Sequence, residues 1–371
     1  MQRASMLSGH RHSEGSPILE AAGIYKLFSG NPSASMEMLK RGMSREEIRN
    51  QGGGVVGLED ISFSVMPGEI FIIMGLSGSG KSTLVRCLNR LIEPTAGKIL
   101  IGGEDATSFR EARLRQLRRQ RISMVFQSFA LLPHRTVVQN VKMGMTIRGD
   151  EAAASEAAAQ DALAKVGLKA WADHYPSTLS GGMRQRVGLA RALATKTDIL
   201  LMDEPFSALD PLIRRELQDE LLTLQAELKK TIIFVTHDIQ EAVRIGTRIA
   251  IMREGKTVQI GTPQALILTP ADDYVRDFAK DLDRGLVLRC GDVMRPLTSG
   301  EAGKRKPPEQ CVRAATLLAN AYKQFGIADE LVVIGEHDEP VGILSARAVL
   351  NALGTMAVAR SVGREGVDAN G

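Results

Sequence analysis

The sequence predicts an α/β fold in which a mostly parallel β-sheet is covered by helices on both faces. Apolar runs of strand length recur along the chain, each flanked by charged residues or glycine. These runs are IFIIM (70–74), ISMVF (122–126), ILLMD (199–203), IIFVT (232–236) and RIAIM (248–252). Helical segments such as 150–168 and 212–230 lie between them. This alternation of strands and helices is typical of a parallel sheet with helices on both sides.

The composition fits a globular chain with one large domain and one smaller domain. The 371 residues are 44% hydrophobic, 24% charged and only 4% aromatic. A net charge of +4 gives little reason to expect nucleic-acid binding. No apolar run reaches about 18 residues, and the first 17 residues lack the apolar core of a signal peptide. We therefore expect the chain to reach a membrane only through partner proteins.

The most basic segment is REARLRQLRRQR at 110–121, which holds six arginines against one glutamate. One interpretation is a surface for an acidic partner or anionic lipid. We prefer a solvated helix face, because runs of charge usually have that simpler role.

The large domain is expected at residues 18–284, after a mobile extension at 1–17 that is rich in Ser, Gly, His and Arg. The segment 29–54 begins and ends in turn-forming residues, and Ser44 and Glu47 have the spacing of a capping box. It is predicted to be an insertion, with a short helix, between two strands of one sheet. After it, two strands joined by a Pro-Gly turn lead to a helix that opens at Gly80.

The character of the sequence changes after residue 284, and we expect a second, small α+β domain at 285–371. A basic, proline-rich linker occupies 303–310. A predicted helix at 311–326, a predicted strand pair within 330–345 and another short helix follow it.

The segment GLSGSGKST matches the pattern G-x-x-x-x-G-K-[ST] and lies between a predicted strand and a predicted helix. Its glycines allow the backbone to curl so that successive amides point at phosphate oxygens, and the helix N-terminus adds positive potential. Lys81 is expected to reach the β- and γ-phosphates, and Ser82 to offer a hydroxyl to Mg²⁺. The predicted nucleotide-binding residues of this loop are Gly75, Ser77, Gly78, Ser79, Gly80, Lys81, Ser82 and Thr83.

Polar side chains also follow three other predicted strands. Asp203 and Glu204 end the run ILLMDE, so their carboxylates emerge at the edge where parallel α/β sheets bind ligands. Asp203 is expected to hold the Mg²⁺ shell, and Glu204 to be the general base that orients the attacking water. His237 follows IIFVT and is expected to contact the γ-phosphate or Glu204. Gln127 follows ISMVF, and its amide oxygen is a candidate ligand for Mg²⁺ or for the water.

A second glycine turn opens a helix in the stretch LSGGMRQRVGLARAL at 179–193. The amides of Gly181 and Gly182 and the hydroxyl of Ser180 lie at the helix N-terminus, which is an anion site. Because this turn lies just before the acidic strand, we do not expect it to reach the phosphate loop of its own chain. If two copies pack head to tail with twofold symmetry, the turn of each copy covers the γ-phosphate held by the other.

These motifs, in this order, resemble those of the ATPase subunits of ATP-binding-cassette (ABC) transporters. The resemblance rests on the Walker A segment 75–82, Gln127, the signature LSGGMRQ at 179–185, the Walker B segment 199–203, the SALD loop at 207–210 and His237. It implies a P-loop NTPase, with a RecA-like core and antiparallel β and α-helical subdomains, that hydrolyses ATP with Mg²⁺. It further implies that Ser180, Gly181, Gly182 and Gln185 act on the ATP of a second copy and that Asp210 bridges the copies.

Residues 20–285 are more closely similar to ATPase subunits of glycine betaine/proline importers of the quaternary-amine class. This likeness lies in the segments 70–101, 124–137 and 179–194 and in the insertion after Phe28. It implies import of a compatible solute such as glycine betaine, proline or choline, at the cytoplasmic face of the inner membrane. A permease, whose coupling helix would dock after Gln127, and an extracytoplasmic substrate-binding protein are the implied partners. An aromatic residue would stack on adenine, with Phe28 preferred over Tyr25.

The small domain resembles a CBS module at DVMRPL (292–297) and at 330–353. Such modules normally work as tandem pairs, whereas one copy is found in this sequence. The resemblance implies either regulation, by ionic strength or a nucleotide, or stabilisation of a dimer.

Two alternatives remain open from the sequence. The same ATPase could drive import of a different amino acid or amine. A soluble ABC protein of DNA repair or translation is the alternative from another class. Repair members need a long coiled-coil insertion and translation members usually fuse two cassettes, and the sequence has neither feature.

Overall fold

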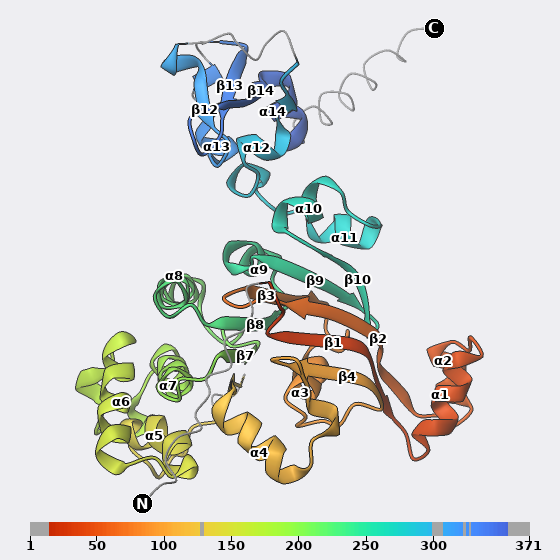
Figure 1. The fold of residues 1–371 in the computed structure, drawn as a ribbon, viewed down its shortest axis with the longest axis vertical. Coiled ribbons are helices and arrows are strands. Elements are labelled where there is room, and N and C mark those ends of the chain that lie inside the picture. Colours follow the sequence, from red (N-terminus) through yellow and green to blue (C-terminus); the bar gives the residue numbers. More distant parts are fainter. Residues whose placement is uncertain (1–14, 127–129, 299–306, 322–323, 326–327, 355–371) are drawn as a thin grey trace, which may run out of the picture. The chain divides into compact units, whose positions relative to one another are not determined.

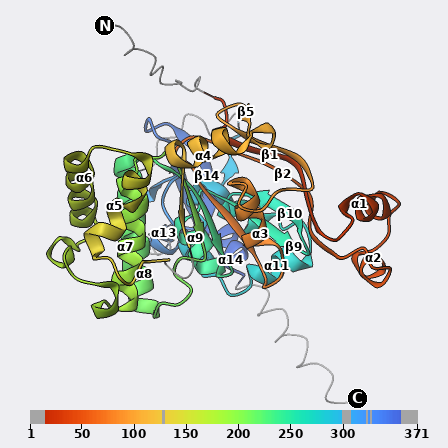
Figure 2. The ribbon, with the colours of Figure 1, turned by 90° about the horizontal axis from the view of Figure 1, so that it is seen from below.

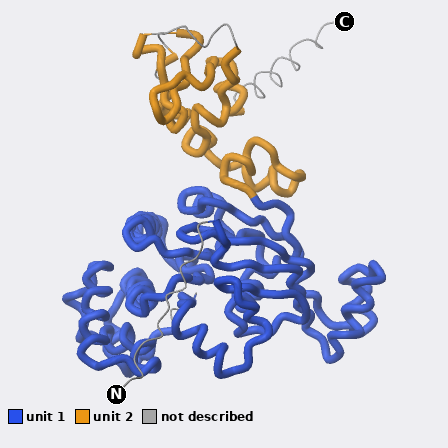
Figure 3. The backbone as a smooth tube through the Cα atoms, in the orientation of Figure 1, with its two compact units in different colours: residues 1–260 blue, residues 261–371 orange. Residues whose placement is uncertain are grey.

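The computed structural model describes residues 15–126, 130–298, 307–321, 324–325 and 328–354 (Figure 1). The chain divides into two units, residues 1–260 and 261–371, which Figure 3 shows in different colours. The boundary expected from the sequence is 284/285, whereas in the structure the segment 261–284 groups with the second unit. Among the described helices, none combines the length and the hydropathy that crossing a membrane requires.

The central sheet of the first unit has six strands in the order β10-β9-β3-β8-β7-β6. The registers of the pairs β9-β3, β3-β8, β8-β7 and β7-β6 are all parallel. The predicted mostly parallel α/β fold is therefore confirmed. The strands are β3 (Ile70–Gly75), β6 (Ile122–Val125), β7 (Ile199–Asp203), β8 (Thr231–Thr236), β9 (Arg248–Arg253) and β10 (Lys256–Gly261).

Strands β3, β7 and β8 are the most deeply placed in this sheet. Every residue in them is buried, as expected of parallel strands covered on both faces. Met74 pairs with Thr236, and Asp203 pairs with Val235. The three strands therefore end at one edge of the sheet, and the loops that follow them share that edge.

A smaller antiparallel sheet, in the order β2-β1-β4-β5, shares the hydrophobic core of the central sheet. Strand β1 pairs antiparallel with both β2 and β4. The ring of Phe63 on β2 stacks on that of Phe71 on β3, with centroids 4.8 Å apart, and so joins the two sheets. The strands are β1 (Leu19–Phe28), β2 (Val55–Val65), β4 (Ala96–Ile101) and β5 (Glu104–Asp105).

Five helices of the first unit fall into two groups. Helices α5, α6 and α7 gather at one end of the unit, as the expected helical subdomain (Figures 1 and 2). Leu84 of α3 and Leu114 of α4 instead belong to the core shared by the two sheets. The helices are α3 (Lys81–Leu88), α4 (Glu111–Gln120), α5 (Val137–Arg148), α6 (Ala152–Lys165), α7 (Gly181–Ala194), α8 (Pro211–Leu228) and α9 (Ile239–Ile245).

The insertion forms two short helices, α1 (Pro32–Lys40) and α2 (Arg45–Asn50), where one was predicted. It lies at the opposite end of the unit from α5, α6 and α7 (Figures 1 and 2). The predicted capping box is present, since Ser44 Oγ accepts from the Glu47 amide at 3.2 Å and Glu47 Oε2 accepts from the Ser44 amide at 2.7 Å. A small core consists of Leu27, Ile48 and Val56, with Met36, Met38, Leu39 and Met43 packed against it.

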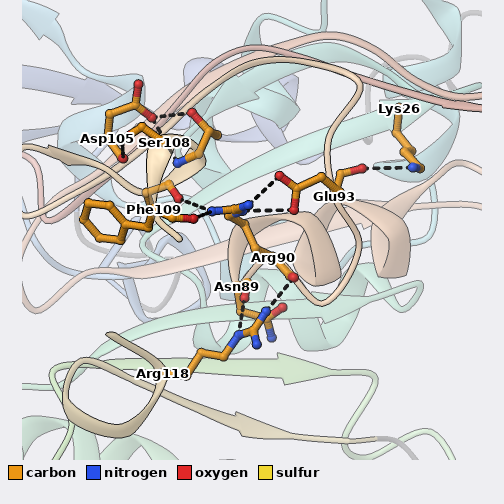
Figure 4. Close-up of polar contacts among 10 residues, drawn as sticks. Lys26, Asn89, Arg90, Glu93, Asp105, Ser108, Phe109 and Arg118 are labelled. Atoms are coloured by element: carbon orange, nitrogen blue, oxygen red, sulfur yellow. Dashed lines mark hydrogen bonds and ion pairs between the residues drawn. The ribbon is translucent and has the colours of Figure 1, made fainter. Parts of the chain in front are cut away.

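Several arginines in and next to helix α4 form hydrogen bonds and ion pairs with other residues of the chain. Figure 4 shows Arg118, which donates to the carbonyl oxygens of Asn89 at 2.9 Å and Arg90 at 2.6 Å. Arg90 in turn forms two hydrogen bonds with the Glu93 carboxylate. Further ion pairs of the run join Arg113 to Glu104 at 2.8 Å and Arg121 to Asp198 at 2.7 Å. The run therefore fixes α4 in place, a role that neither interpretation of the sequence included.

The second unit contains a four-stranded sheet in the order β11-β14-β13-β12. Strand β14 is antiparallel to β11 and β13, and β12 is parallel to β13. The strands are β11 (Arg295–Pro296), β12 (Cys311–Arg313), β13 (Glu330–Ile334) and β14 (Pro340–Ser345). The helices are α10 (Pro263–Leu268), α11 (Asp273–Phe278), α12 (Cys290–Val293), α13 (Leu318–Ala321) and α14 (Ala346–Leu353). Short 3₁₀ turns in the chain lie at 106–108, 169–171, 176–178, 284–286 and 308–310.

The predicted helix at 311–326 is wrong in its first part. Residues 311–313 form β12, which pairs with residues 332–334 of β13, and Val312 is buried. The described helix of this segment is the short α13. Pairing with a strand about twenty residues away outweighs the local helical pattern, because strand formation depends on tertiary context.

Candidate nucleotide-binding and hydrolysis site

The loop between β3 and α3 is shaped by close backbone contacts. Gly80 has a φ of 97° and caps the N-terminus of α3. A Cβ atom there would lie 2.8 Å from the Gly57 carbonyl oxygen, and one on Gly75 would lie 2.3 Å from the Met252 carbonyl oxygen. Both positions therefore require glycine. The first amides of α3, those of Lys81, Ser82 and Thr83, have no acceptor within the helix, so the loop presents donors suited to an anion.

Lys81 is almost fully buried within this loop. Its side chain is 5% exposed, and Nζ donates to the carbonyl oxygens of Gly75 at 2.9 Å and Leu76 at 3.0 Å. Burial lowers the pKa of Lys81, while the carboxylates of Glu204 and Asp203 act in the opposite direction. The ammonium group is thus held at the loop by carbonyl oxygens and nearby acids.

Asp203 ends β7 beside the start of α3. It is 3% exposed, and its Oδ1 accepts a hydrogen bond from Ser82 Oγ at 2.8 Å. Its other oxygen, Oδ2, lies 3.5 Å from the guanidinium of Arg86. A hydroxyl and a carboxylate are hard oxygen donors, and this donor chemistry fits Mg²⁺. Gln127, the other expected ligand, lies outside the described residues.

Glu204 joins the phosphate loop to the end of β8. Its Oε1 lies 3.8 Å from Lys81 Nζ, and its Oε2 lies 3.3 Å from Nδ1 of His237. The backbone φ is 45°, which is strained for a residue with a side chain. The Glu204 amide donates to Val235 at 3.2 Å, and its carbonyl accepts from Ser207 Oγ at 3.0 Å. Both contacts hold the carboxylate at the sheet edge, with the side chain 18% exposed.

The structure brings Lys81, Ser82, Asp203, Glu204 and His237 into one chain of contacts. Ser82 contacts Asp203, and Glu204 contacts both Lys81 and His237. The two sets of contacts are joined because residues 81 and 82, and residues 203 and 204, are neighbours in the chain. The arrangement pairs a phosphate-binding loop with two acids and an exposed imidazole. It can bind a nucleoside triphosphate, hold a hard cation and place a base beside the terminal phosphate.

The remaining loop residues differ in exposure. Ser77 and Gly78 are exposed, whereas Thr83 is half-buried. Ser79 is 4% exposed, and its Oγ has no hydrogen-bond partner in the part of the chain that the structure describes. Because this oxygen is buried, its missing partner would have to be a bound water molecule or a ligand that enters the loop.

Ser180 and the glycines after it open α7 as predicted. Ser180 caps the helix and accepts from the Met183 amide at 3.2 Å. A Cβ atom on Gly182 would lie 2.8 Å from the Ile213 side chain. Gln185 is only 1% exposed, so its side chain points into the unit. No hydrogen bond or ion pair between described residues joins this turn to the phosphate loop.

Asp210 has a local structural role that the sequence analysis missed. Its carboxylate caps α8 by accepting from the amides of Leu212 at 3.1 Å and Ile213 at 3.0 Å. The spacing Asp-Pro at the start of a helical run is a sequence signal for such a cap.

The two candidate adenine-stacking residues both lie on β1. Phe28 is 45% exposed, and Lys26 Nζ lies 5.1 Å from its ring centroid. Tyr25 is half-buried, and burial raises the pKa of its hydroxyl, with smaller effects from Asp60 and Glu59. The more accessible ring is therefore that of Phe28.

Arg86 is a site residue that the sequence analysis missed. It pairs with the buried Asp203, as described above, and its side chain is 48% exposed. Arg86 follows Ser82 by four positions on α3, so both side chains lie on the same helix face. That spacing was the available signal.

Comparisons with known proteins agree with this geometry. Residues 58–207 match the ABC transporter family. The chain is 49% identical over 336 residues to the glycine betaine/proline betaine transport ATP-binding protein ProV of Escherichia coli, covering 90% of this chain and 82% of ProV. It is 42% identical over 339 residues to the trimethylamine N-oxide transport ATP-binding protein TmoW of Ruegeria pomeroyi, covering 91% and 98% of the two chains.

A solved structure gives the same result for the fold. The dimeric ATP-binding cassette MJ0796, bound to ADP and phosphate, is 30% identical to this chain with a TM-score of 0.56. The match covers 66% of this chain and 98% of that one. With the identity to ProV and TmoW, this establishes that the chain belongs to the ATP-hydrolysing, ATP-binding subunits of ABC transporters.

Proposed function

We propose that this ABC ATPase powers import of a compatible solute of the glycine betaine, proline or choline type through a membrane permease. The observation that carries the cargo class is the 49% identity to ProV over 336 residues, which extends beyond the cassette into the second unit. The identity to TmoW supports a small quaternary or tertiary amine derivative in general. The alternative is import of a different amino acid or amine by the same ATPase.

The phosphate loop is proposed to bind ATP through the α3 amides and Lys81. In the structure, the Lys81 ammonium contacts Gly75, Leu76 and Glu204. The β- and γ-phosphates would replace these acceptors, because ionised oxygens make stronger hydrogen bonds than carbonyl oxygens. Ser82, Asp203 and Gln127 would hold Mg²⁺, which neutralises phosphate charge when it is bound.

Glu204 is proposed to be the general base. It would accept a proton from water as the water oxygen bonds to the γ-phosphorus and the bond to the β-γ bridging oxygen breaks, which leaves ADP and phosphate. His237, 3.3 Å from Glu204 Oε2, would orient the carboxylate and reach the γ-phosphate. When ATP draws Lys81 away, Glu204 loses a cationic contact and is free to accept that proton.

The signature turn is proposed to complete the ATP site of a second copy. The amides after Ser180 would bind the partner's γ-phosphate, and Asp210 would lie at the contact between the copies. The dimeric state of the MJ0796 structure supports this arrangement. The buried position of Gln185 indicates a supporting role in the turn rather than direct contact with the nucleotide.

Further partners follow from an import function. A permease would anchor the subunit at the cytoplasmic face of the inner membrane and dock near residues 128–137, and a substrate-binding protein would deliver the solute from outside. Residues 285–371 are proposed to be a CBS-like module that regulates the transporter or stabilises its dimer.

The test is uptake of labelled glycine betaine by cells that carry the whole transporter, with wild-type subunit or Lys81→Ala, at low and high external salt. We expect uptake in the wild type and its loss in the variant. Arg49→Gln, in an exposed pair with Glu46, is the matched control for a lost cation. ATP-dependent uptake of another amine, without glycine betaine uptake, would replace the cargo assignment and leave the ATPase assignment standing.

A further inference from the structure

We propose that Arg45, supplied by the insertion at 29–54, is a positioning residue for the phosphate loop. The insertion would then be part of the ATP-binding apparatus of this subunit, beyond its place between two strands. The inference rests on the proposed role of the loop at 75–83 in ATP binding, but on neither the cargo nor the permease.

The first observation is a continuous path of contacts from Arg45 to the loop. The Arg45 guanidinium donates to the Val56 carbonyl oxygen at 3.1 Å and to Glu59 Oε2 at 3.3 Å. The Glu59 amide donates to the Gly255 carbonyl oxygen at 2.9 Å. The Gly255 amide donates to the Ser79 carbonyl oxygen at 2.9 Å, and Ser79 belongs to the loop. Four segments that are distant in sequence are thus connected in series.

The second observation is that the backbone at Gly57, Gly80 and Gly255 is so closely packed that no Cβ atom would fit at Gly80 or Gly255. A Cβ atom on Gly255 would lie 2.4 Å from the Gly57 carbonyl oxygen and 2.8 Å from Nη2 of Arg45. A Cβ atom on Gly80 would lie 2.8 Å from the same Gly57 oxygen. The Gly57 carbonyl is therefore packed between the phosphate loop and the turn at Gly255, and Arg45 closes the outer side of that turn. In such tight packing, a displacement of the turn is passed on to its neighbours.

The third observation concerns charge. Glu59 lies between two cations, Arg45 and Lys256, and its Oε1 is 2.8 Å from Lys256 Nζ. The side chains of Glu59 and Arg45 are 17% and 25% exposed, so solvent screens their pair less than a surface pair. Replacing Arg45 would leave Glu59 with Lys256, which is 57% exposed and lies on the turn itself. The turn would then lose its link to the insertion, while the Glu59 amide would still hold it to β2.

The other arginines of the insertion do not have this reach. Arg41 pairs with Glu37 at 4.0 Å, and Arg49 pairs with Glu46 at 3.8 Å. The first pair lies at α1 and the second within α2, so neither pair reaches another segment of the chain. The two arginine side chains are 76% and 63% exposed. They are matched controls for the loss of a positive charge from the insertion.

The test is the equilibrium affinity of the full chain for ATP with Mg²⁺. We expect Arg45→Gln to raise the Kd for ATP by about fivefold to tenfold, which is an ordinary strength of coupling between linked sites. The rate at saturating ATP should stay close to that of the wild type, because Arg45 touches no reacting group. The Kd of Arg45→Lys should lie between those of the wild type and Arg45→Gln, because a single ammonium group replaces a guanidinium that contacts two acceptors. Arg41→Gln and Arg49→Gln should bind ATP as the wild type does.

A second measurement is made on the wild type and does not depend on an Arg45 variant that folds. Because coupling is reciprocal, ATP should slow backbone hydrogen exchange at 45–50 in the wild type. Lys81→Ala should abolish this protection if the loop is the ATP site. Unchanged exchange at 45–50 in ATP-saturated wild type, or unchanged ATP affinity in a folded Arg45→Gln, would overturn the proposal and leave Arg45 as an anchor of the insertion. If Lys81→Ala binds ATP normally, the assignment of the loop fails instead.

Discussion

Helices α3 and α7 both begin with a glycine turn and a nearby serine, yet their surroundings within one chain differ. At the start of α3, Ser82 bonds to Asp203 at 2.8 Å and Lys81 lies 3.8 Å from Glu204. At the start of α7, the side chain of Ser180 caps its own helix through the Met183 amide. The first turn contacts acids of its own chain, whereas no hydrogen bond or ion pair between described residues joins the second turn to a carboxylate. The difference supports the proposal that the α7 turn completes the ATP site of a second copy instead of a site in its own chain.

The largest expected effect is on the rate of ATP hydrolysis and comes from substitution of Glu204, one of the two acids at the α3 site. Glu204→Gln keeps the shape of the side chain but removes the base, so hydrolysis should fall by about a thousandfold while ATP binding persists. ATP that is bound and not cleaved should also favour a stable dimer. Single-turnover hydrolysis and sedimentation with ATP measure the two results. Hydrolysis at the wild-type rate would refute the base assignment.

The next effect tests whether the α7 turn acts across copies. Ser180→Arg fills the turn with a cationic side chain, so hydrolysis should fall by about a hundredfold, whereas ATP binding by dilute single subunits should stay unchanged. Lys81→Ala should lose both ATP hydrolysis and ATP binding by single subunits. Steady-state hydrolysis and ATP titration at low protein concentration separate the two variants.

A mixture of Ser180→Arg and Lys81→Ala tests directly whether the α7 turn of one copy acts on the ATP site of the other. A mixed dimer has one site with both defects and one site with neither, so an equal mixture should regain about a quarter of the wild-type hydrolysis if the sites act independently. If Ser180→Arg weakens ATP binding by single subunits as much as Lys81→Ala does, the turn acts in its own chain.

The α3 half of the comparison was largely predictable from sequence. The apolar run at 70–74, the glycine spacing and Lys81 are local signals, and the structure has β3, the loop and α3 in that order. The acids at 203 and 204 could also be placed, since parallel strands end at one edge of a sheet. Local pattern and tertiary structure agree there because β3, the loop and α3 follow one another directly in the chain, from Ile70 to Leu88.

Contacts between distant segments could not be predicted in the same way. The pair of Arg86 with Asp203 joins residues 117 positions apart along the chain, and Arg45 reaches Glu59 through the fold of the insertion. The strand at 311–313 depends on its partner at 332–334, so its local helical pattern misled the prediction. Side-chain pairs and strand pairs of this kind are set by tertiary packing, which one sequence does not display.

The smallest effect concerns which ring of β1 meets adenine near the α3 loop. A Cβ atom on Gly57 would lie 2.7 Å from the Phe28 ring, and Gly57 also touches Gly80 of the loop, so Phe28 lies one residue away from the phosphate site. Phe28→Leu, which keeps apolar bulk but removes the aromatic face, should raise the Kd for ATP by about threefold to tenfold. Tyr25→Leu should change it less, because Tyr25 is half-buried. Titration with ATP and with inorganic triphosphate separates base stacking from phosphate binding, since only ATP affinity should fall. The reverse order of the two variants would assign the stacking role to Tyr25.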